Sequence, residues 1–108
     1  MHEEQAVAAL AALAHPLRLK LFRALVVVGP PGLTPGAIID GIGMPAATLS
    51  FHLKELTTAG LVSQQRSGRN VIYRAAFDAM NGLVDYLTEN CCQGAACSDE
   101  STSAACGC

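Results

Sequence analysis

Helical periodicity dominates the first part of the chain, where apolar side chains recur every three or four positions. This spacing places them along one face of a helix. Pro16 suits the first turn of a helix, and the sequence GPPG at residues 29–32 ends that helix. Thr34 followed by Pro35 has the pattern of an N-cap with proline at the first helical position. The pattern predicts four helices, at residues 3–14, 16–28, 35–40 and 45–59.

The third and fourth predicted helices together form a helix-turn-helix. A tight turn with the sequence GIG at residues 41–43 joins them, and Gly60 supplies the left-handed residue that ends the fourth helix. The apolar positions expected to line the four helices are Val7, Leu10 and Leu13 in the first, Leu17, Leu21, Leu25 and Val28 in the second, Ala37, Ile38 and Ile39 in the third, and Leu49, Leu53 and Leu56 in the fourth.

The pattern then changes to that of a β-hairpin followed by one more helix. Residues 61–66 and 70–75 are strand-like, and the link SGR at residues 67–69 is short enough for a hairpin. Residues 76–90 return to helical spacing, and their apolar face is too wide for a solvent-exposed terminal helix, so we expect it to pack against a second copy of the chain. The predicted fold of residues 1–90 is mainly α with a small β-hairpin, a homodimeric winged helix-turn-helix. The apolar positions of its last helix are Phe77, Met80, Val84 and Leu87.

Composition supports a single small domain in the cytoplasm. The chain has 108 residues and is 51% hydrophobic, enough for one modest core. No apolar run approaches the roughly 20 residues of a membrane span, and residues 1–5 carry two glutamates where a signal peptide would be basic. No nucleophile, base and orienting residue recur at recognisable spacing, and no phosphate-cradling glycine loop is present. We therefore expect neither a membrane partner nor an enzyme.

Charge is segregated along the chain, although the net charge is only −2. Residues 1–44 carry equal numbers of acidic and basic side chains. Residues 45–75 carry four bases and one acid, a net charge of +3, whereas residues 76–108 carry five acids and no lysine or arginine. The middle of the chain is therefore the expected phosphate-facing surface.

The cysteines are also segregated. All five lie in the last eighteen positions, in a segment made otherwise mostly of glycine, alanine and serine. We expect residues 91–108 to form a flexible tail that stays disordered unless a ligand organises it. A disulfide framework is not expected in a reducing cytoplasm, so these thiols are available as ligands for a soft ion.

Two segments carry a family resemblance. Residues 50–62 (SFHLKELTTAGLV), preceded by residues 13–21 (LAHPLRLKL), resemble the ArsR/SmtB family of metal-sensing winged-helix proteins. The resemblance extends over about residues 5–90. It implies a homodimer that binds palindromic double-stranded operator DNA without ligand and releases it when an ion binds.

The fourth predicted helix is the expected recognition helix. Its N-terminal part would enter the major groove, and arginines at the hairpin tip would reach a minor groove or a phosphate. The helix residues project opposite Leu49 and Leu53, a position that a solvated helix face would also explain. His52 is expected to be a packed or phosphate-contacting residue, not a metal ligand. The candidate DNA-binding residues are Thr48, Ser50, Phe51, His52, Lys54, Arg66 and Arg69.

The candidate inducer site is a set of three tail cysteines. One family site places cysteines in the first helix of the helix-turn-helix, and residues 36–41 contain none. Other members resemble this chain at residues 86–92, where a vicinal cysteine pair ends the last helix and a third thiol follows. Here the three are Cys91, Cys92 and Cys97.

Three thiolates match the pyramidal coordination of trivalent arsenic or antimony, which we expect as an inducer, with no permanently bound cofactor. Alternatives remain open at this point. Cys106 and Cys108 could complete a four-thiolate zinc or cadmium site. Oxidation of the tail thiols could instead make the protein a redox switch. The thiols could also be inert, or the domain could be a metal carrier that does not bind DNA.

Overall fold

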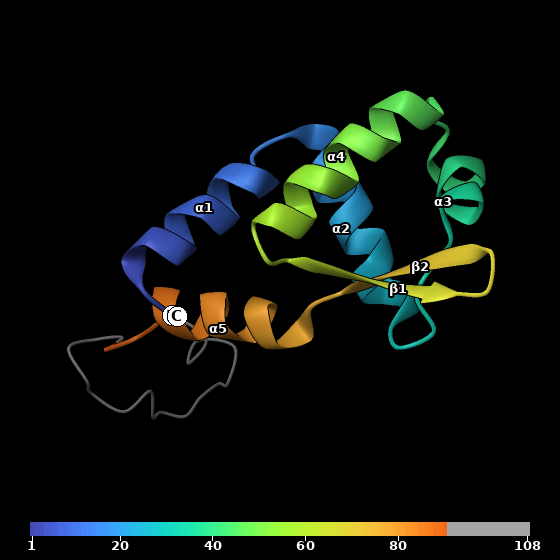
Figure 1. The fold of residues 1–108 in the computed structure, drawn as a ribbon. Coiled ribbons are helices and arrows are strands. Elements are labelled where there is room, and N and C mark those ends of the chain that lie inside the picture. Colours follow the sequence, from blue (N-terminus) through green and yellow to red (C-terminus); the bar gives the residue numbers. More distant parts are fainter. Residues whose placement is uncertain (91–108) are drawn as a thin grey trace, which may run out of the picture.

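The computed structural model describes residues 1–90, which form five helices and one hairpin. Helices α1 and α5 lie together at one end of the molecule, and α3 and the hairpin tip lie at the other end (Figure 1). In chain order the elements are α1 (Glu3–Leu13), α2 (Pro16–Val28), α3 (Pro35–Ile42), α4 (Ala46–Thr58), β1 (Val62–Ser67), β2 (Asn70–Ala75) and α5 (Phe77–Leu87).

The predicted winged helix-turn-helix is confirmed, with small changes at element ends. Helix α3 continues to Ile42 instead of ending near Asp40, because the left-handed residue that ends it is Gly43, with φ +82°. Helix α4 begins at Ala46, and Pro45 is its extended N-cap residue and not its first helical residue.

The core is built around α4, whose Leu49, Leu53 and Leu56 are buried as predicted. Helix α1 buries a different face from the predicted one. Ala6, Ala9 and Ala12 face the core, whereas Val7 is 58% exposed and Leu10 is also exposed. Small alanine side chains allow α1 to pack closely on its neighbours, which leaves Val7 and Leu10 outside. Leu13, the third predicted position, is partly buried against the core. Ala37 of α3 is likewise exposed, contrary to expectation.

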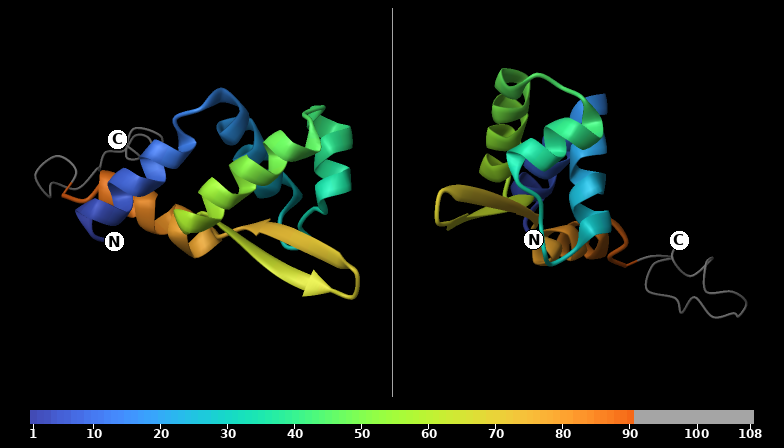
Figure 2. Two further views of the ribbon diagram at one scale, coloured as in Figure 1. Left: turned by 45° about the horizontal axis from the view of Figure 1, so that its top comes forward. Right: turned by 90° about the vertical axis from the view of Figure 1, so that its right-hand side faces the viewer.

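Strands β1 and β2 form an antiparallel hairpin that projects beyond the helices (Figure 2). Its base carries a third strand-like residue that the sequence pattern did not indicate. Leu33, in the loop between α2 and α3, exchanges two backbone hydrogen bonds with Tyr73, of 2.9 and 2.8 Å. The hairpin is thereby attached to the helix-turn-helix at its root.

Gly32 makes this attachment possible. Its φ is +70°, and a Cβ placed there would lie 2.6 Å from the carbonyl oxygen of Tyr73 and 2.7 Å from Cγ2 of Ile72. Any side chain would push β2 away from the loop.

We predict that Gly32→Ala lowers the free energy of unfolding by about 2–4 kcal/mol, because it adds a backbone clash to left-handed strain. Gly43→Ala is the matched control. Gly43 also has a positive φ, but its added Cβ would meet nothing within 4 Å, so only the left-handed cost of about 1 kcal/mol is expected. Urea denaturation of both variants measures the difference, and equal losses would contradict the proposed clash.

Candidate nucleic-acid interface

The helix-turn-helix is held by caps at its ends and by a buried seam between its helices. Oγ1 of Thr34 accepts a hydrogen bond from the backbone N–H of Ala37, at 3.3 Å, which caps the start of α3. Ile38 of α3, Met44 of the turn and Leu49 of α4 are all buried. This packing fixes which side of α4 faces outward.

Four of the candidate residues lie on or near that outward side. Ser50, Phe51 and Lys54 are exposed, and Thr48 is half-buried. Phe51 is a large aromatic side chain that the fold leaves in solvent, next to a lysine and a serine. The combination offers apolar contact, hydrogen bonding and positive charge on one helix surface.

The hairpin contributes two more exposed candidates. Arg66 lies on β1 and Arg69 in the turn between the strands. Arg74, the other arginine of this region, is held by neighbours: its Nε donates to the carbonyl oxygen of Pro30 and one terminal nitrogen donates to Oε1 of Gln65, each at 2.6 Å. Arg74 therefore contributes to the positive charge of the region while bracing the hairpin against the loop before α3.

His52 differs from the other six candidates because it is buried, with 4% of its surface exposed. Its Nδ1 accepts a hydrogen bond of 3.0 Å from Nε of Arg18 on α2. Its ring also lies 4.6 Å from the ring of His15, measured between centroids. His52 thus faces α2 from beneath the outward surface of α4.

Arg18 contacts both a buried and an exposed residue of α4. Besides its bond to buried His52, its guanidinium carbon lies 5.4 Å from the ring centroid of exposed Phe51, within the range of a cation–π interaction. Sequence spacing did not indicate this contact. Arg18 and His52 lie in the two motifs that carry the family resemblance, but only the fold brings the motifs together.

Burial lowers the pKa of His52, and the nearby His15 and Arg18 lower that pKa further. The neutral imidazole is also the form that the hydrogen bond requires, because a protonated Nδ1 cannot accept from Arg18. The cluster therefore favours an uncharged His52 in the folded protein.

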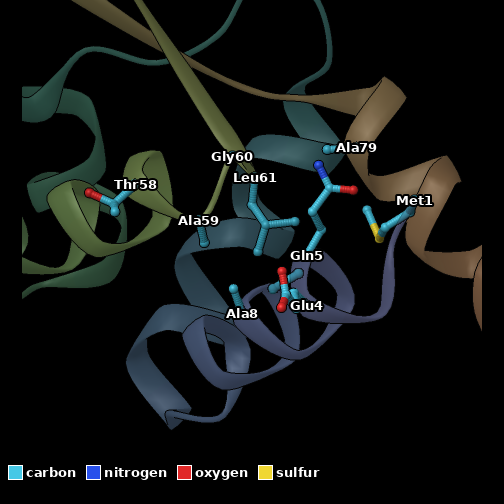
Figure 3. Close-up of a pocket in the computed structure, with 10 residues that line it drawn as sticks. Met1, Glu4, Gln5, Ala8, Thr58, Ala59, Gly60, Leu61 and Ala79 are labelled. Carbon is cyan, nitrogen blue, oxygen red and sulfur yellow. The ribbon is translucent and has the colours of Figure 1, made fainter.

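A second region of the surface is hollowed but differs chemically from the α4 face. A hollow of about 470 Å³ lies among α1, the end of α4 and the start of α5 (Figure 3). Its lining combines small residues with a few larger side chains, and Glu4 is its one ionisable side chain. It offers no side-chain cation to a phosphate, unlike the surface formed by α4 and the hairpin.

The predicted cysteine site lies outside the described residues, since Cys91, Cys92 and Cys97 all follow residue 90. Within residues 1–90, no group of three or more histidine, cysteine, aspartate or glutamate side chains is arranged to hold a metal ion. None of the helices in this part of the chain is long and apolar enough to cross a membrane.

Three comparisons with known proteins agree with this geometry. Residues 13–65 match a helix-turn-helix domain family. The chain is 32% identical over 89 residues to the HTH-type transcriptional regulator YgaV of Escherichia coli K12, covering 82% of this chain and 88% of YgaV.

Two solved structures share the fold. An ArsR-like regulator from Rhodococcus sp. RHA1 superimposes with a TM-score of 0.70 at 23% identity, covering 78% of this chain and 76% of that one. The homodimeric winged-helix domain of Mb0332 from Mycobacterium bovis, a possible ArsR-family regulator, gives 0.65 at 27% identity and covers 89% of each chain.

Fold and outward surface together define a winged helix-turn-helix of the DNA-binding type. The sequence identity to its relatives, and the share of each chain that the matches cover, show the family within this class. The chain belongs to the ArsR/SmtB family of transcriptional regulators.

We predict that His52→Asn reduces the loss of stability on acidification. Asparagine keeps a hydrogen-bond acceptor for Arg18 but does not titrate. In the wild type, His52 takes up a proton near pH 6.5 when unfolded and only at lower pH when folded. Below 6.5 the unfolded chain holds more protons, so stability falls as pH falls; above it His52 contributes no pH dependence. Urea unfolding across this range measures both proteins, and parallel curves would contradict the prediction.

Proposed function

We propose that this regulator is a repressor that binds operator DNA as a ligand-free dimer and releases it when trivalent arsenic or antimony binds Cys91, Cys92 and Cys97. The observation that carries the proposal is the position of the cysteines. A vicinal pair follows α5 by only a few residues, and all five cysteines lie in the last eighteen positions.

The donor set fits the chemistry of the inducer. Trivalent arsenic is soft and takes three thiolates. The four residues between Cys92 and Cys97 are glutamine, glycine and two alanines, so no bulky side chain opposes the return of the third thiol to the pair. A bound arsenic would form one bond to each of the three sulfurs. The chain connects these sulfurs to the end of α5.

For DNA, we propose direct contact by six side chains and an indirect role for the seventh. Phe51 suits apolar contact with a thymine methyl group, and the hydroxyl and ammonium groups beside it suit base edges and phosphates. His52 is buried, so we propose that it acts through Arg18 to hold α4. The six proposed contacts are Thr48, Ser50, Phe51, Lys54, Arg66 and Arg69.

We propose that the dimer forms through α1 and α5. These helices pack on each other and leave apolar side chains outside, with Val84 53% and Leu87 57% exposed on α5 and Val7 and Leu10 exposed on α1. The Mycobacterium bovis domain is homodimeric, which supports a dimer for this chain; the exposed apolar side chains are the reason for placing its interface at α1 and α5. The same end of the molecule carries the start of the cysteine segment, so an ion bound there would act where the subunits meet.

Release requires the ion to favour the conformation that does not bind DNA. A 100-fold loss of operator affinity needs a difference of about 2.7 kcal/mol, within the usual range of allosteric coupling. A change in the direction of α5 would alter the distance between the two recognition helices, which a palindromic operator fixes.

We predict that Cys91→Ser and Cys92→Ser keep operator affinity within about twofold but reduce arsenite-induced release at least tenfold, because two thiolates hold arsenic less tightly than three. Cys106→Ser and Cys108→Ser are the matched controls and should release as the wild type does. Fluorescence anisotropy of reduced protein on labelled DNA from upstream of its own gene measures both properties.

The same titrations with antimonite, cadmium, zinc and peroxide separate the alternatives. Release by cadmium or zinc that depends on Cys106 and Cys108 would replace the three-thiolate site by a four-thiolate one. Release by peroxide alone would make the tail a redox switch. Persistent arsenite release from both Cys91→Ser and Cys92→Ser would refute the assigned ligands.

We predict that Val84→Glu raises the dimer dissociation constant at least tenfold, because it would bury an unpaired carboxylate between apolar surfaces. Val27→Glu is the matched control: Val27 is 79% exposed on α2, outside the proposed interface. Sedimentation equilibrium measures the dissociation constants. Equal dimerisation of both variants would place the interface elsewhere.

A further inference from the structure

A second hollow, of about 210 Å³, lies between the recognition helix and the hairpin, close to the proposed DNA surface. Buried Leu53 is its one apolar lining residue, and the other lining residues are polar. None of the lining residues is acidic. The polar residues are Ser50, Lys54, Thr57, Thr58, Gln64 and Tyr73.

The fold brings these side chains together from two directions. On α4, Ser50, Lys54 and Thr57 are spaced by four and three residues, so they lie along one helix face. On the hairpin, Gln64 and Tyr73 are direct partners in the antiparallel register and therefore project from the same face of the sheet. That face is the one turned toward α4.

The chemistry of the lining selects an anion. Hydroxyl, ammonium and amide groups all donate hydrogen bonds, and Lys54 adds a positive charge. The acid next to Lys54 in the sequence, Glu55, lines a different hollow on the side of Arg18. The space between α4 and the hairpin is thus supplied with donors and has no carboxylate to oppose a negative ligand.

We propose that this hollow binds one phosphate of the operator backbone, with Lys54 as its charged partner and Ser50, Thr57, Gln64 and Tyr73 as neutral donors. The proposal rests on the proposed DNA-binding function and extends it to Thr57, Gln64 and Tyr73, which the sequence did not indicate. Arg66 lies two residues beyond Gln64 on the same face of β1, on the side of the hairpin tip. It would therefore lie next to the proposed phosphate site.

Such a phosphate would set the angle of α4 on the duplex. Contacts to the DNA backbone position a protein, whereas contacts to base edges specify the sequence. A phosphate held jointly by α4 and the hairpin would fix both elements on one strand. Loss of the contact should therefore weaken binding to all sequences alike.

The test compares Tyr73→Phe, which removes only a hydroxyl, and Lys54→Gln with the exposed control Lys20→Gln. Anisotropy titrations on operator and scrambled DNA are repeated at several salt concentrations. Lys54→Gln should lower the slope of log affinity against log salt by about one, because one phosphate contact is lost. Tyr73→Phe should weaken both DNAs about tenfold without changing the slope.

Operators with one neutral methylphosphonate at a time locate the phosphate. At one position per half-site, the loss of affinity seen with wild type should vanish in Tyr73→Phe and Lys54→Gln, because the partner is already missing. Additive losses of affinity at every position would overturn the proposed phosphate site while leaving DNA binding in place. A salt slope for Lys54→Gln equal to that of wild type would do the same. A wild type that binds no DNA at low salt would overturn the proposed function as well.

Inorganic phosphate would satisfy the same donors. Calorimetry of the wild type with inorganic phosphate alone separates the two sources of the anion. Micromolar binding that Tyr73→Phe abolishes would assign the hollow to a free anion and overturn the assignment to DNA. Only millimolar or weaker binding is expected from a seat shaped by one phosphodiester.

Discussion

The burial of one face of α4 is the constraint on which the rest of the molecule depends. Leu49, Leu53 and Leu56 are almost inaccessible to solvent, and burial of each leucine contributes about 1.5–3 kcal/mol. Rotating the helix about its axis would expose them, so the rotation is fixed by the core. The outward direction of Ser50 and Lys54 follows from that rotation, and the proposed DNA surface is a consequence of core packing.

The hairpin obeys a second constraint, which is its attachment to the loop before α3. The paired hydrogen bonds of Leu33 and Tyr73 hold its root, and Arg74 bonds the carbonyl oxygen of Pro30 across the same junction. Gly32 permits the close approach. A hairpin joined to the helices only through its two chain ends would sample many angles relative to α4. This one is tied to the helix-turn-helix, so the two elements present a single surface.

The sequence predicted those features that depend on local periodicity, and it missed those that depend on tertiary contact. The leucines of α4 were predicted because their spacing is that of a helix face. The inward face of α1 was not, because close helix packing favoured Ala9 over the larger Leu10. The contact between Arg18 and His52 spans 34 positions, and no spacing rule reaches so far. Tyr73 was read only as a strand residue, since its partner across the hairpin depends on register.

The proposed inducer response must pass through a stiff connection. The N–H of Leu61 bonds the carbonyl oxygen of Leu56 at the end of α4, and the N–H of Ala76 bonds the carbonyl oxygen of Leu61. Helix α5 begins at the next residue, so the recognition helix, hairpin and α5 are joined by consecutive hydrogen bonds around a buried corner. Bending within one subunit would break these bonds. In the proposed dimer, moving one whole subunit relative to the other accommodates a change at the end of α5 at a lower free-energy cost. This movement changes the spacing of the two proposed recognition helices. It leaves the proposed DNA surface of each subunit intact.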